Sequence, residues 1–432
     1  MRGTERERVI LVGLAAGRAG RIRVEEHLDE LERLMETAGG TVVAREVQER
    51  DAPDPATLVG RGFAERLAER CRDLGAAAVI FDEDLTPSQV RNLERELPEE
   101  VKVLDRAAVI LDIFAQHART REAQTQVELA QLTYLLPRLT RRWRHLSRQA
   151  GGIGTRGVGE TQLEIDRRLI SRRITQLRRQ LGRIERTRRL RRRRRQGLPS
   201  VALVGYTNAG KSSLFRRLSR AEVLVEDRLF ATLDPRARRI ELGDGLVVVL
   251  SDTVGFIRKL PHELVAPFQS TLEEAAEADL VLHVVDGSHP AWRAHLEVGA
   301  SVLEELGVDR SRVLPVVNKV DLLEAADRAR LHRDLGGVAV SAVSGEGLEA
   351  LRTAMLEALL AGGGLQLARI PLEDPEAVQR ALGAEALVAR RFAGEHVTVA
   401  LRVDGQGLEA MGLGPYRTAR WREGGRAGAE GG

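Results

Sequence analysis

The stretch Val201–Ser213 reads VALVGYTNAGKSS and decides the fold of the chain around it. An apolar run enters a glycine-rich loop that ends in Lys211 and Ser212, and a helical pattern follows. This is the context of a phosphate-binding loop, in which glycines let backbone N–H groups wrap phosphate oxygens. We expect Lys211 to span the β- and γ-phosphates and Ser212 to bind Mg²⁺. The sequence therefore predicts a P-loop domain with a doubly wound sheet.

Downstream motifs indicate which nucleotide binds. Asp252–Gly255 (DTVG) ends an apolar run, so Asp252 can hold magnesium through water and the Gly255 N–H can meet the γ-phosphate. Asn318–Asp321 (NKVD) follows another apolar run, and a carboxylate there accepts two hydrogen bonds that guanine donates and adenine cannot. Ser341–Val343 fits the loop whose backbone amides contact the base. Because all these motifs occur in the right order, we predict a GTPase.

The predicted ligands of Mg²⁺ are Ser212 and Thr232. Thr232 lies in FATLD, 20 residues after Ser212, and its hydroxyl is expected to reach the metal only when a triphosphate is bound. The predicted enzyme is a Mg²⁺-dependent GTP phosphohydrolase with GTP as substrate. The residues expected to contact nucleotide or metal are Gly205, Tyr206, Thr207, Asn208, Ala209, Gly210, Lys211, Ser212, Phe230, Ala231, Thr232, Leu233, Asp234, Asp252, Thr253, Val254, Gly255, Asn318, Lys319, Val320, Asp321, Ser341, Ala342 and Val343.

No side chain is assigned as the catalytic group; Lys211, Asn208, Thr232 and Gly255 are expected to stabilise or position. Small signalling GTPases place a water-orienting glutamine after this motif, where the chain has Phe256. A phenyl ring cannot orient water, so slow intrinsic hydrolysis is predicted unless a partner completes the site. An asparagine at the place of Asn208 helps potassium-stimulated GTPases hold K⁺ against the phosphates, stabilising transition-state charge. The alternative is a loop asparagine bonded to its own backbone.

Composition sets the class of protein. The chain has 432 residues, enough for two to four domains, and one cysteine, Cys71, which excludes a disulfide framework. No apolar run approaches the ~20 residues that cross a bilayer. We therefore expect a soluble cytoplasmic protein, a monomer without stable membrane insertion. Residues 138–195 carry 21 arginines and four acidic residues, a net charge of +17, so the rest of the chain carries −13. This asymmetry predicts a basic element that meets a polyanion.

Leucines and isoleucines indicate that the basic element is a helical hairpin. They recur at heptad spacing from Leu129 to Leu146 and again from Leu163 to Ile184. The glycine-rich segment 151–162 separates the two stripes, which predicts two antiparallel arms of about 30 residues zipped along an apolar seam. The alternative is a helical spacer with a solvated face. The run Arg191–Arg195 is expected to contact RNA backbone, or else to pair with the acidic body.

The remaining chain is predicted to form α/β units. Short apolar strands at 9–13, 41–47, 76–81 and 101–105 alternate with amphipathic helices, which favours a small parallel sheet. Only one strand, HVTVALRV, is evident near the C-terminus. The predicted organisation is an α/β domain over 1–116, the hairpin over 117–197, a GTPase domain over 198–361, a GGGLQ linker, a small α+β domain over 366–423 and a disordered tail over 424–432.

Together these motifs resemble the HflX family of translation-factor-related GTPases, over nearly the whole chain. The most specific stretch is GGIGTRGVGETQLEIDRR at 151–168, followed by GYTNAGKS, FATLDP, DTVGFIRKLPHELV and NKVD. FDEDLTPSQVRNLE at 81–94 and VLDRAAVILDIFAQHARTREAQTQVELAQLTYLLPRL at 103–139 are similarly characteristic. The resemblance implies the same nucleotide and magnesium residues as above. It also implies binding to the large ribosomal subunit and its rRNA, with hydrolysis stimulated there.

The resemblance further implies a role in splitting or rescuing stalled ribosomes, or in subunit biogenesis, under stress. Family members place the hairpin and its glycine-rich loop near the peptidyl-transferase region. Two other functions remain open. The first is an ATP-driven RNA remodeller with a second nucleotide site in the N-terminal domain, although GLAAG (Gly13–Gly17) there lacks a lysine. The second is a membrane-surface regulator whose basic helix lies on anionic lipid.

Overall fold

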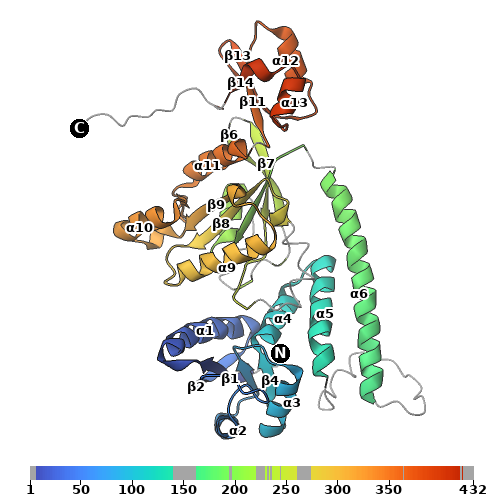
Figure 1. Cartoon of the computed structure of the whole chain (residues 1–432), viewed down its shortest axis with the longest axis vertical. Helices are drawn as coiled ribbons and strands as arrows, with labels where there is room; N and C mark the ends of the chain where they lie inside the picture. The colour runs from blue at the N-terminus through green and yellow to red at the C-terminus, as the bar shows by residue number, and fades with distance from the viewer. Residues whose placement is uncertain are drawn as a thin grey trace, which may run out of the picture. The chain divides into compact units, whose positions relative to one another are not determined.

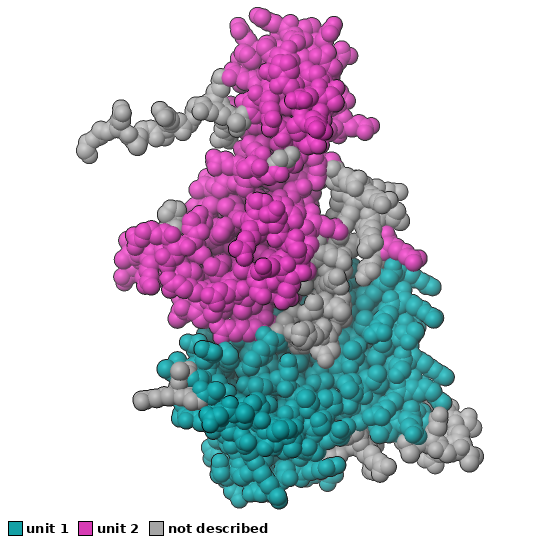
Figure 2. Space-filling model, viewed as in Figure 1, with its two compact units in different colours: residues 1–185, 228–233, 259–269 teal, residues 186–227, 234–258, 270–432 magenta. Residues whose placement is uncertain are grey.

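A computed structural model describes residues 6–139, 162–193, 197–219, 229–230, 233, 236–243, 245–259, 274–362, 364–418 and 421. The chain divides into two compact units (Figures 1 and 2). Unit 1 comprises residues 1–185, 228–233 and 259–269, and unit 2 comprises residues 186–227, 234–258 and 270–432. Each unit contains a sheet with parallel strands, as the alternating pattern predicts.

Unit 1 begins with a parallel four-stranded sheet, and its strands are those predicted. Strands β1 (Arg8–Ala15), β2 (Thr41–Glu49), β3 (Ala78–Phe81) and β4 (Lys102–Asp105) lie in the order β2-β1-β3-β4. The helices between them are α1 (Gly17–Ala38), α2 (Arg61–Leu74), α3 (Pro87–Glu96) and α4 (Arg106–His117). Helix α1 ends at a glycine: Gly39 adopts a φ of 92°, which is unfavourable for other residues.

The described residues include parts of both arms of the predicted helical hairpin, and the first α-helix ends at Leu135. Helix α5 (Arg121–Leu135) passes into a 3₁₀ turn at Leu136–Arg138, because Pro137 cannot continue the α-helical hydrogen bonds. Helix α6 (Gln162–Arg193) has the expected length. The predicted seam exists: Leu129 packs with Ile174 and Leu177, among others. The tip loop 151–161 and the leucine stripe beyond Leu139 lie outside the described residues.

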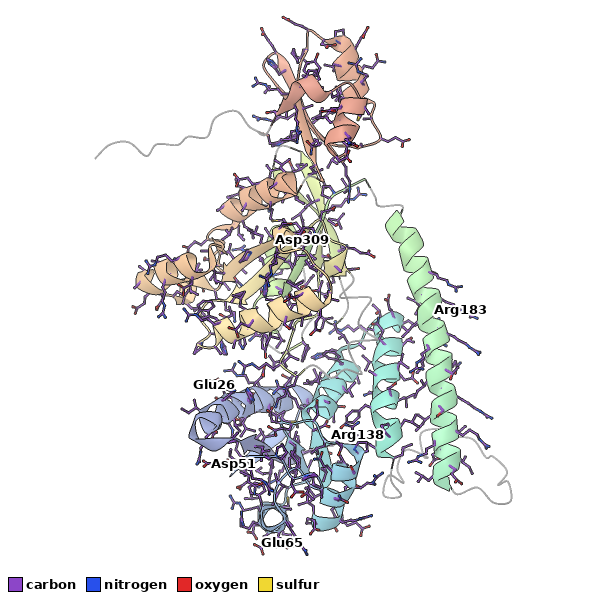
Figure 3. The ribbon with its side chains drawn as sticks, in the orientation of Figure 1. Glu26, Asp51, Glu65, Arg138, Arg183 and Asp309 are labelled. Carbon is purple, nitrogen blue, oxygen red and sulfur yellow. The ribbon has the colours of Figure 1, made fainter. Side chains whose placement is uncertain are left out.

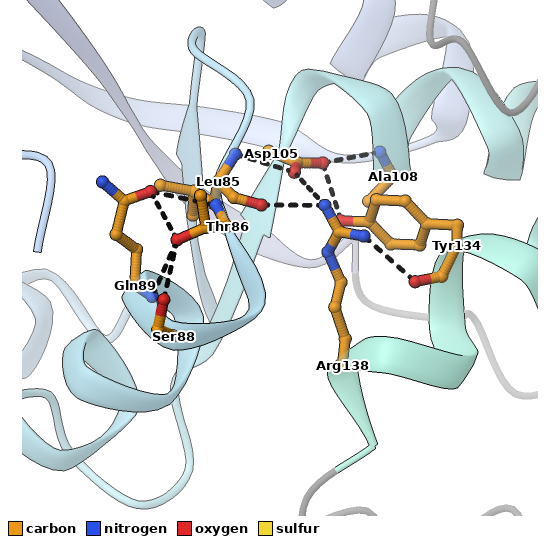
Figure 4. A network of polar contacts seen from close by, with 8 residues as sticks. All are labelled: Leu85, Thr86, Ser88, Gln89, Asp105, Ala108, Tyr134 and Arg138. Carbon is orange, nitrogen blue, oxygen red and sulfur yellow. Dashed lines mark hydrogen bonds and ion pairs between the residues drawn. The ribbon is translucent and has the colours of Figure 1, made fainter. Parts of the chain in front are cut away.

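A buried polar network joins α5 to the sheet (Figure 4). The Asp105 carboxylate accepts hydrogen bonds from the Tyr134 hydroxyl at 2.7 Å and from the Leu85 N–H at 3.1 Å. The Arg138 guanidinium donates to the Leu85 carbonyl at 2.8 Å and lies 3.7 Å from the Tyr134 ring centre. Arg138 was counted with the basic element, but its side chain is only 10% exposed and serves this network instead.

A second buried cluster fills the carboxyl edge of the sheet between β1 and β3. Asp82 is fully buried, and its carboxylate pairs with Arg106 at 2.8 Å, with His27 at 3.3 Å and with Lys259 at 2.5 Å, all within unit 1. Burial alone would raise the pKa of Asp82, but the His27 hydrogen bond and the charges of Arg106 and Lys259 outweigh it and lower the pKa. Arg106 also pairs with Glu30.

Unit 2 contains the predicted doubly wound sheet. Its strands are β5 (Ser200–Gly205), β6 (Arg236–Gly243), β7 (Leu246–Asp252), β8 (Leu280–Asp286), β9 (Val313–Asn318) and β10 (Val338–Ala339). The order is β10-β9-β8-β5-β7-β6, parallel except for the edge pair β6–β7. The helical elements are α7 (Lys211–Ser219), α9 (Trp292–Glu305), η3 (Arg310–Arg312), η4 (Val320–Leu322), α10 (Ala325–Leu335) and α11 (Leu348–Ala361).

The C-terminal part of unit 2 is a second, antiparallel sheet with four strands, where the sequence revealed one. Its elements are β11 (Gln366–Pro371), α12 (Pro375–Leu382), β12 (Leu387–Ala393), β13 (His396–Leu401), α13 (Gly405–Ala410), η5 (Gly414–Tyr416) and β14 (Arg417–Thr418), with strand order β12-β13-β11-β14. The predicted linker is partly core: Leu365 is 3% exposed and shares one apolar cluster with Leu359 and Leu367.

We predict that Asp82→Asn destabilises the N-terminal sheet by about 3 kcal/mol, because it leaves the buried charge of Arg106 and the partly exposed charge of Lys259 under-compensated. Native-state hydrogen exchange of peptides covering β3 and α4 measures this locally. Since the folded pKa of Asp82 is depressed, the stabilisation is present at neutral pH and fades below pH 4. The matched control, Asp309→Asn at an exposed cap, should change exchange little; equal exchange in both variants would contradict the prediction.

Candidate nucleotide-binding site

The backbone of the loop that follows β5 requires glycine at two positions. Gly205 has a φ of 145°, and a Cβ there would lie 2.1 Å from the Val284 carbonyl oxygen. Gly210 has a φ of 88°, and a Cβ there would lie 2.2 Å from the Asn318 amide nitrogen. Asn208 adopts a φ of 60°, which asparagine tolerates well. This gives a local reason for asparagine at that position, and the potassium role stays a prediction.

Lys211 begins helix α7 and curls back over this loop. Its ammonium group donates to the carbonyls of Gly205 at 3.0 Å and of Tyr206 at 2.8 Å. The side chain is buried, and burial lowers its pKa to about 8, although the nearby charge of Asp252 opposes the shift. A helix start with an ammonium above a glycine-rich turn is an arrangement that binds phosphate.

The DTVG motif lies against the loop. Asp252 ends β7 beside Leu203 of β5, and the Thr253 hydroxyl donates to the Leu203 carbonyl at 2.7 Å. Gly255 is so close that a Cβ there would lie 2.8 Å from the Thr207 Cα atom and 2.9 Å from the Lys211 ammonium. Val254 is buried beside it. The motif's glycine is therefore required by contact with the loop.

Asn318 connects the two remaining motifs to the phosphate-binding loop. Its amide nitrogen donates to the Ala209 carbonyl at 2.9 Å, and its oxygen accepts from the Ala342 N–H at 3.1 Å. Ser341 is fully buried, and its hydroxyl accepts from the Ser344 N–H at 3.0 Å. Asn318 thus holds the expected base-contact loop beside the glycine-rich loop.

The other residues of the NKVD motif follow Asn318 and differ in burial. Val320 is buried, whereas Asp321 is exposed, as a carboxylate that binds guanine must be. Val343 is 77% exposed. Lys319 adopts a φ of 63° and pairs with Asp286 at 2.7 Å. Asp286 was not among the site residues predicted from the sequence. Its position at the end of a predicted strand, at the edge that carries the other motifs, could have indicated it.

The segment around Thr232 is only partly described. Ala231, Thr232 and Asp234 lie outside the described residues. Phe230 and Leu233 are both 2% exposed, and the Phe230 ring packs edge-on against Phe114, with centroids 4.6 Å apart, within unit 1. The expected contact of this segment with nucleotide stays a prediction.

The donor set fits magnesium. The Ser212 hydroxyl stands in the first turn of α7, and the Asp252 carboxylate ends the adjacent strand β7, so both supply the oxygen ligands that Mg²⁺ prefers. Among the described residues, no group of three or more His, Cys, Asp or Glu side chains could hold a metal. Mg²⁺ in nucleotide sites usually takes one or two protein ligands together with phosphate oxygens and water.

Comparisons with known proteins agree with this geometry. Three family models match: "GTP-binding GTPase N-terminal" at 25–115, "GTP-binding GTPase Middle Region" at 117–195 and "50S ribosome-binding GTPase" at 200–319. "GTPase HflX" of Magnetococcus marinus is 50% identical over 82% of each chain. "GTPase HflX" of Escherichia coli is 47% identical over 81% of this chain and 83% of its own.

A solved structure is also similar. A GTP-binding protein from the archaeon Sulfolobus solfataricus, in complex with GDP, is 25% identical over 82% of this chain and 99% of that chain, with a TM-score of 0.41. Within the described part of the chain, no helix is long and apolar enough to span a membrane.

We predict that Gly255→Ala lowers GTP binding and hydrolysis at least tenfold, because the new methyl group would overlap Thr207 and displace the Lys211 ammonium. Nucleotide titration and phosphate release measure both effects. Gly182→Ala is the matched control, since a Cβ there meets nothing within 4 Å. Hydrolysis by Gly255→Ala at the rate of the control would show that this contact is unimportant.

Affinity for GTP should fall as the pH rises above about 8. The pKa of Lys211 is lowered to about 8, so the side chain is a charged ammonium below that pH and a neutral amine above it. Above about pH 8, Lys211 must therefore take up a proton when phosphate binds. Above about pH 8, the affinity for GTP should fall by up to tenfold for each pH unit. Titrations from pH 7 to 9.5 measure it. Lys211→Met should bind weakly at every pH; the same slope in that variant would assign the effect to another group.

Proposed function

Because the chain belongs to the HflX family of GTPases, we propose that it hydrolyses GTP while bound to the large ribosomal subunit, in splitting or rescue of stalled ribosomes or in subunit biogenesis. The observation that carries the proposal is the match of residues 200–319 to a family described as "50S ribosome-binding GTPase". A basic helix in the same chain supports it, because ribosomal RNA is a dense polyanion. We place this activity in the cytoplasm, where ribosomes are found.

At the nucleotide site we assign roles by position. Lys211 spans the β- and γ-phosphates, and the Gly255 N–H meets the γ-phosphate. Ser212, and Asp252 through water, hold Mg²⁺, with Thr232 as the second protein ligand. Bound magnesium neutralises charge on the β- and γ-phosphates. Asp321 accepts the two guanine hydrogen bonds, and Ala342 presents its loop to the base.

Hydrolysis by the isolated chain is expected to be slow. Phe256 is 2% exposed, and its amide and carbonyl are both bonded to the phosphate-binding loop. The Phe256 side chain cannot orient the attacking water, which supports stimulation by the ribosome. Potassium at Asn208 is a further possible source of transition-state charge, and a sodium-for-potassium exchange in the hydrolysis assay tests it.

Helix α6 offers a surface for RNA. One stripe carries four exposed arginines: Arg168, Arg172, Arg179 and Arg183. At about 100° per residue they fall within roughly 60° of the helix circumference, on the side opposite the buried Leu177 and Leu181. Figure 3 shows Arg183 projecting from α6. The helix continues to Arg193 and so includes Arg191, Arg192 and Arg193 of the arginine run, whereas Arg194 and Arg195 lie outside the described residues. Arg173, next to this stripe, pairs with Glu128 across the hairpin.

The other two functions are less well supported. A second nucleotide site in the N-terminal sheet would need positive potential at its carboxyl edge, where doubly wound sheets bind ligands. That edge carries Asp82 and Glu83, and Asp82 is already paired with Arg106. A membrane-surface helix needs a broad apolar face, whereas the seam of α6 already packs against α5.

Cosedimentation with separated ribosomal subunits tests the proposed function. The chain should pellet with the large subunit more strongly with a non-hydrolysable GTP analogue than with GDP, and large subunits should accelerate phosphate release. Equal binding in both nucleotide states, or pelleting with neither subunit, would overturn the proposal.

Replacing the four stripe arginines by glutamine should weaken large-subunit binding at least tenfold at 100 mM salt and flatten its salt dependence, because each lost phosphate contact reduces the slope by about one. A matched control replaces four exposed arginines elsewhere: Arg61, Arg91, Arg95 and Arg310. If the two quadruple variants bind alike at every salt concentration, the stripe does not contact RNA.

A further inference from the structure

We propose that Tyr206 is a positioning residue for GTP hydrolysis, whose hydroxyl fastens the segment after Gly255 to the phosphate-binding loop. The side chain is 4% exposed, and its hydroxyl accepts a hydrogen bond from the Arg258 N–H at 3.0 Å. Tyr206 thus belongs to the loop that surrounds phosphate, yet its side chain holds the backbone of the DTVG segment.

Two backbone hydrogen bonds hold the near end of the same segment. The Phe256 N–H donates to the Gly205 carbonyl at 2.9 Å, and the Thr207 N–H donates to the Phe256 carbonyl at 2.7 Å. The Tyr206 hydroxyl adds a third bond two residues further on, at Arg258. Residues on the carboxyl side of Gly255 are therefore held at two points, and this sets the direction of the Gly255 N–H.

Helix α9 fixes the orientation of the tyrosine ring. The ring stacks on His295, with centroids 3.8 Å apart and planes 8° from parallel. His289 lies on His295 at 4.4 Å, and its Nδ1 atom accepts a hydrogen bond from the Ala291 N–H at 3.1 Å. A ring held by stacking loses little further entropy when its hydroxyl bonds, so the stack directs that hydroxyl at Arg258.

The effect should be specific for the triphosphate. The Gly255 N–H can contact only the γ-phosphate, which GDP lacks, so interactions that aim this N–H act on GTP binding and on the transition state. A residue that merely kept the loop folded would instead alter the affinity for GTP and GDP alike.

Tyr206→Phe tests the hydroxyl, because it keeps the stacked ring and removes one hydrogen bond. We expect kcat without ribosomes, and the ratio of GTP to GDP affinity, to fall about fivefold, the effect of one net hydrogen bond, with GDP affinity unchanged within twofold. Tyr416→Phe is the matched control: its hydroxyl bonds Asp374 in the C-terminal sheet domain, and both quantities should stay as in wild type.

Variants at His295 test the stack. His295→Phe keeps an aromatic face and should retain kcat, whereas His295→Ala should lose it as Tyr206→Phe does. Unchanged kcat and nucleotide preference in Tyr206→Phe would overturn the proposal, and so would an equal loss of GTP and GDP affinity. Equal losses in the two His295 variants would refute the supporting role of the stack. Because these assays omit ribosomes, their outcome is independent of the ribosomal proposal.

Discussion

The buried side-chain amide of Asn318 holds together motifs that lie more than 100 residues apart in the sequence. Asn318 bonds the Ala209 carbonyl with its nitrogen and the Ala342 amide with its oxygen, and both partners are backbone groups. Its closeness excludes any side chain at Gly210. An aspartate could accept from Ala342 but could not donate to Ala209, which explains why the position needs an amide. The phosphate end and the base end of the site therefore depend on one residue, and neither loop can shift without the other.

The sequence was a good guide where short-range pattern decides structure. The phosphate-binding loop, the apolar strands and the heptad seam each carry their signal within a few residues, and all are present. Prediction from the sequence failed where the structure depends on contacts between residues far apart in the chain, or where one residue interrupts a periodic pattern. Pro137 stops α5 inside an apparently continuous stripe. Strand β12 contains Arg390 and Arg391 in succession, so its alternation is masked and the C-terminal sheet was underestimated.

Two parallel sheets in this chain share an architecture but differ in the charge at their carboxyl edges. In unit 2 that edge carries Lys211 above a turn of backbone amides, which favours an anion. In unit 1 the same edge carries Asp82, neutralised by Arg106. Partners of Asp82 come from positions up to 177 residues away in the sequence, so no local pattern could have revealed the cluster. A fold therefore does not by itself fix which ligand binds.

The segment after DTVG constrains how catalysis can work. Phe256 is buried, both of its backbone polar groups are bonded to the phosphate-binding loop, and Arg258 is held by Tyr206. Moving residues 256–258 toward the γ-phosphate would break those bonds, and the described residues 256–259 include no glutamine. Residues 256–258 therefore present no water-orienting side chain, and in the proposed mechanism this segment holds the Gly255 N–H as a fixed donor. A rigid donor costs no reorganisation at the moment of reaction, so the bonds that immobilise the segment also serve the chemistry.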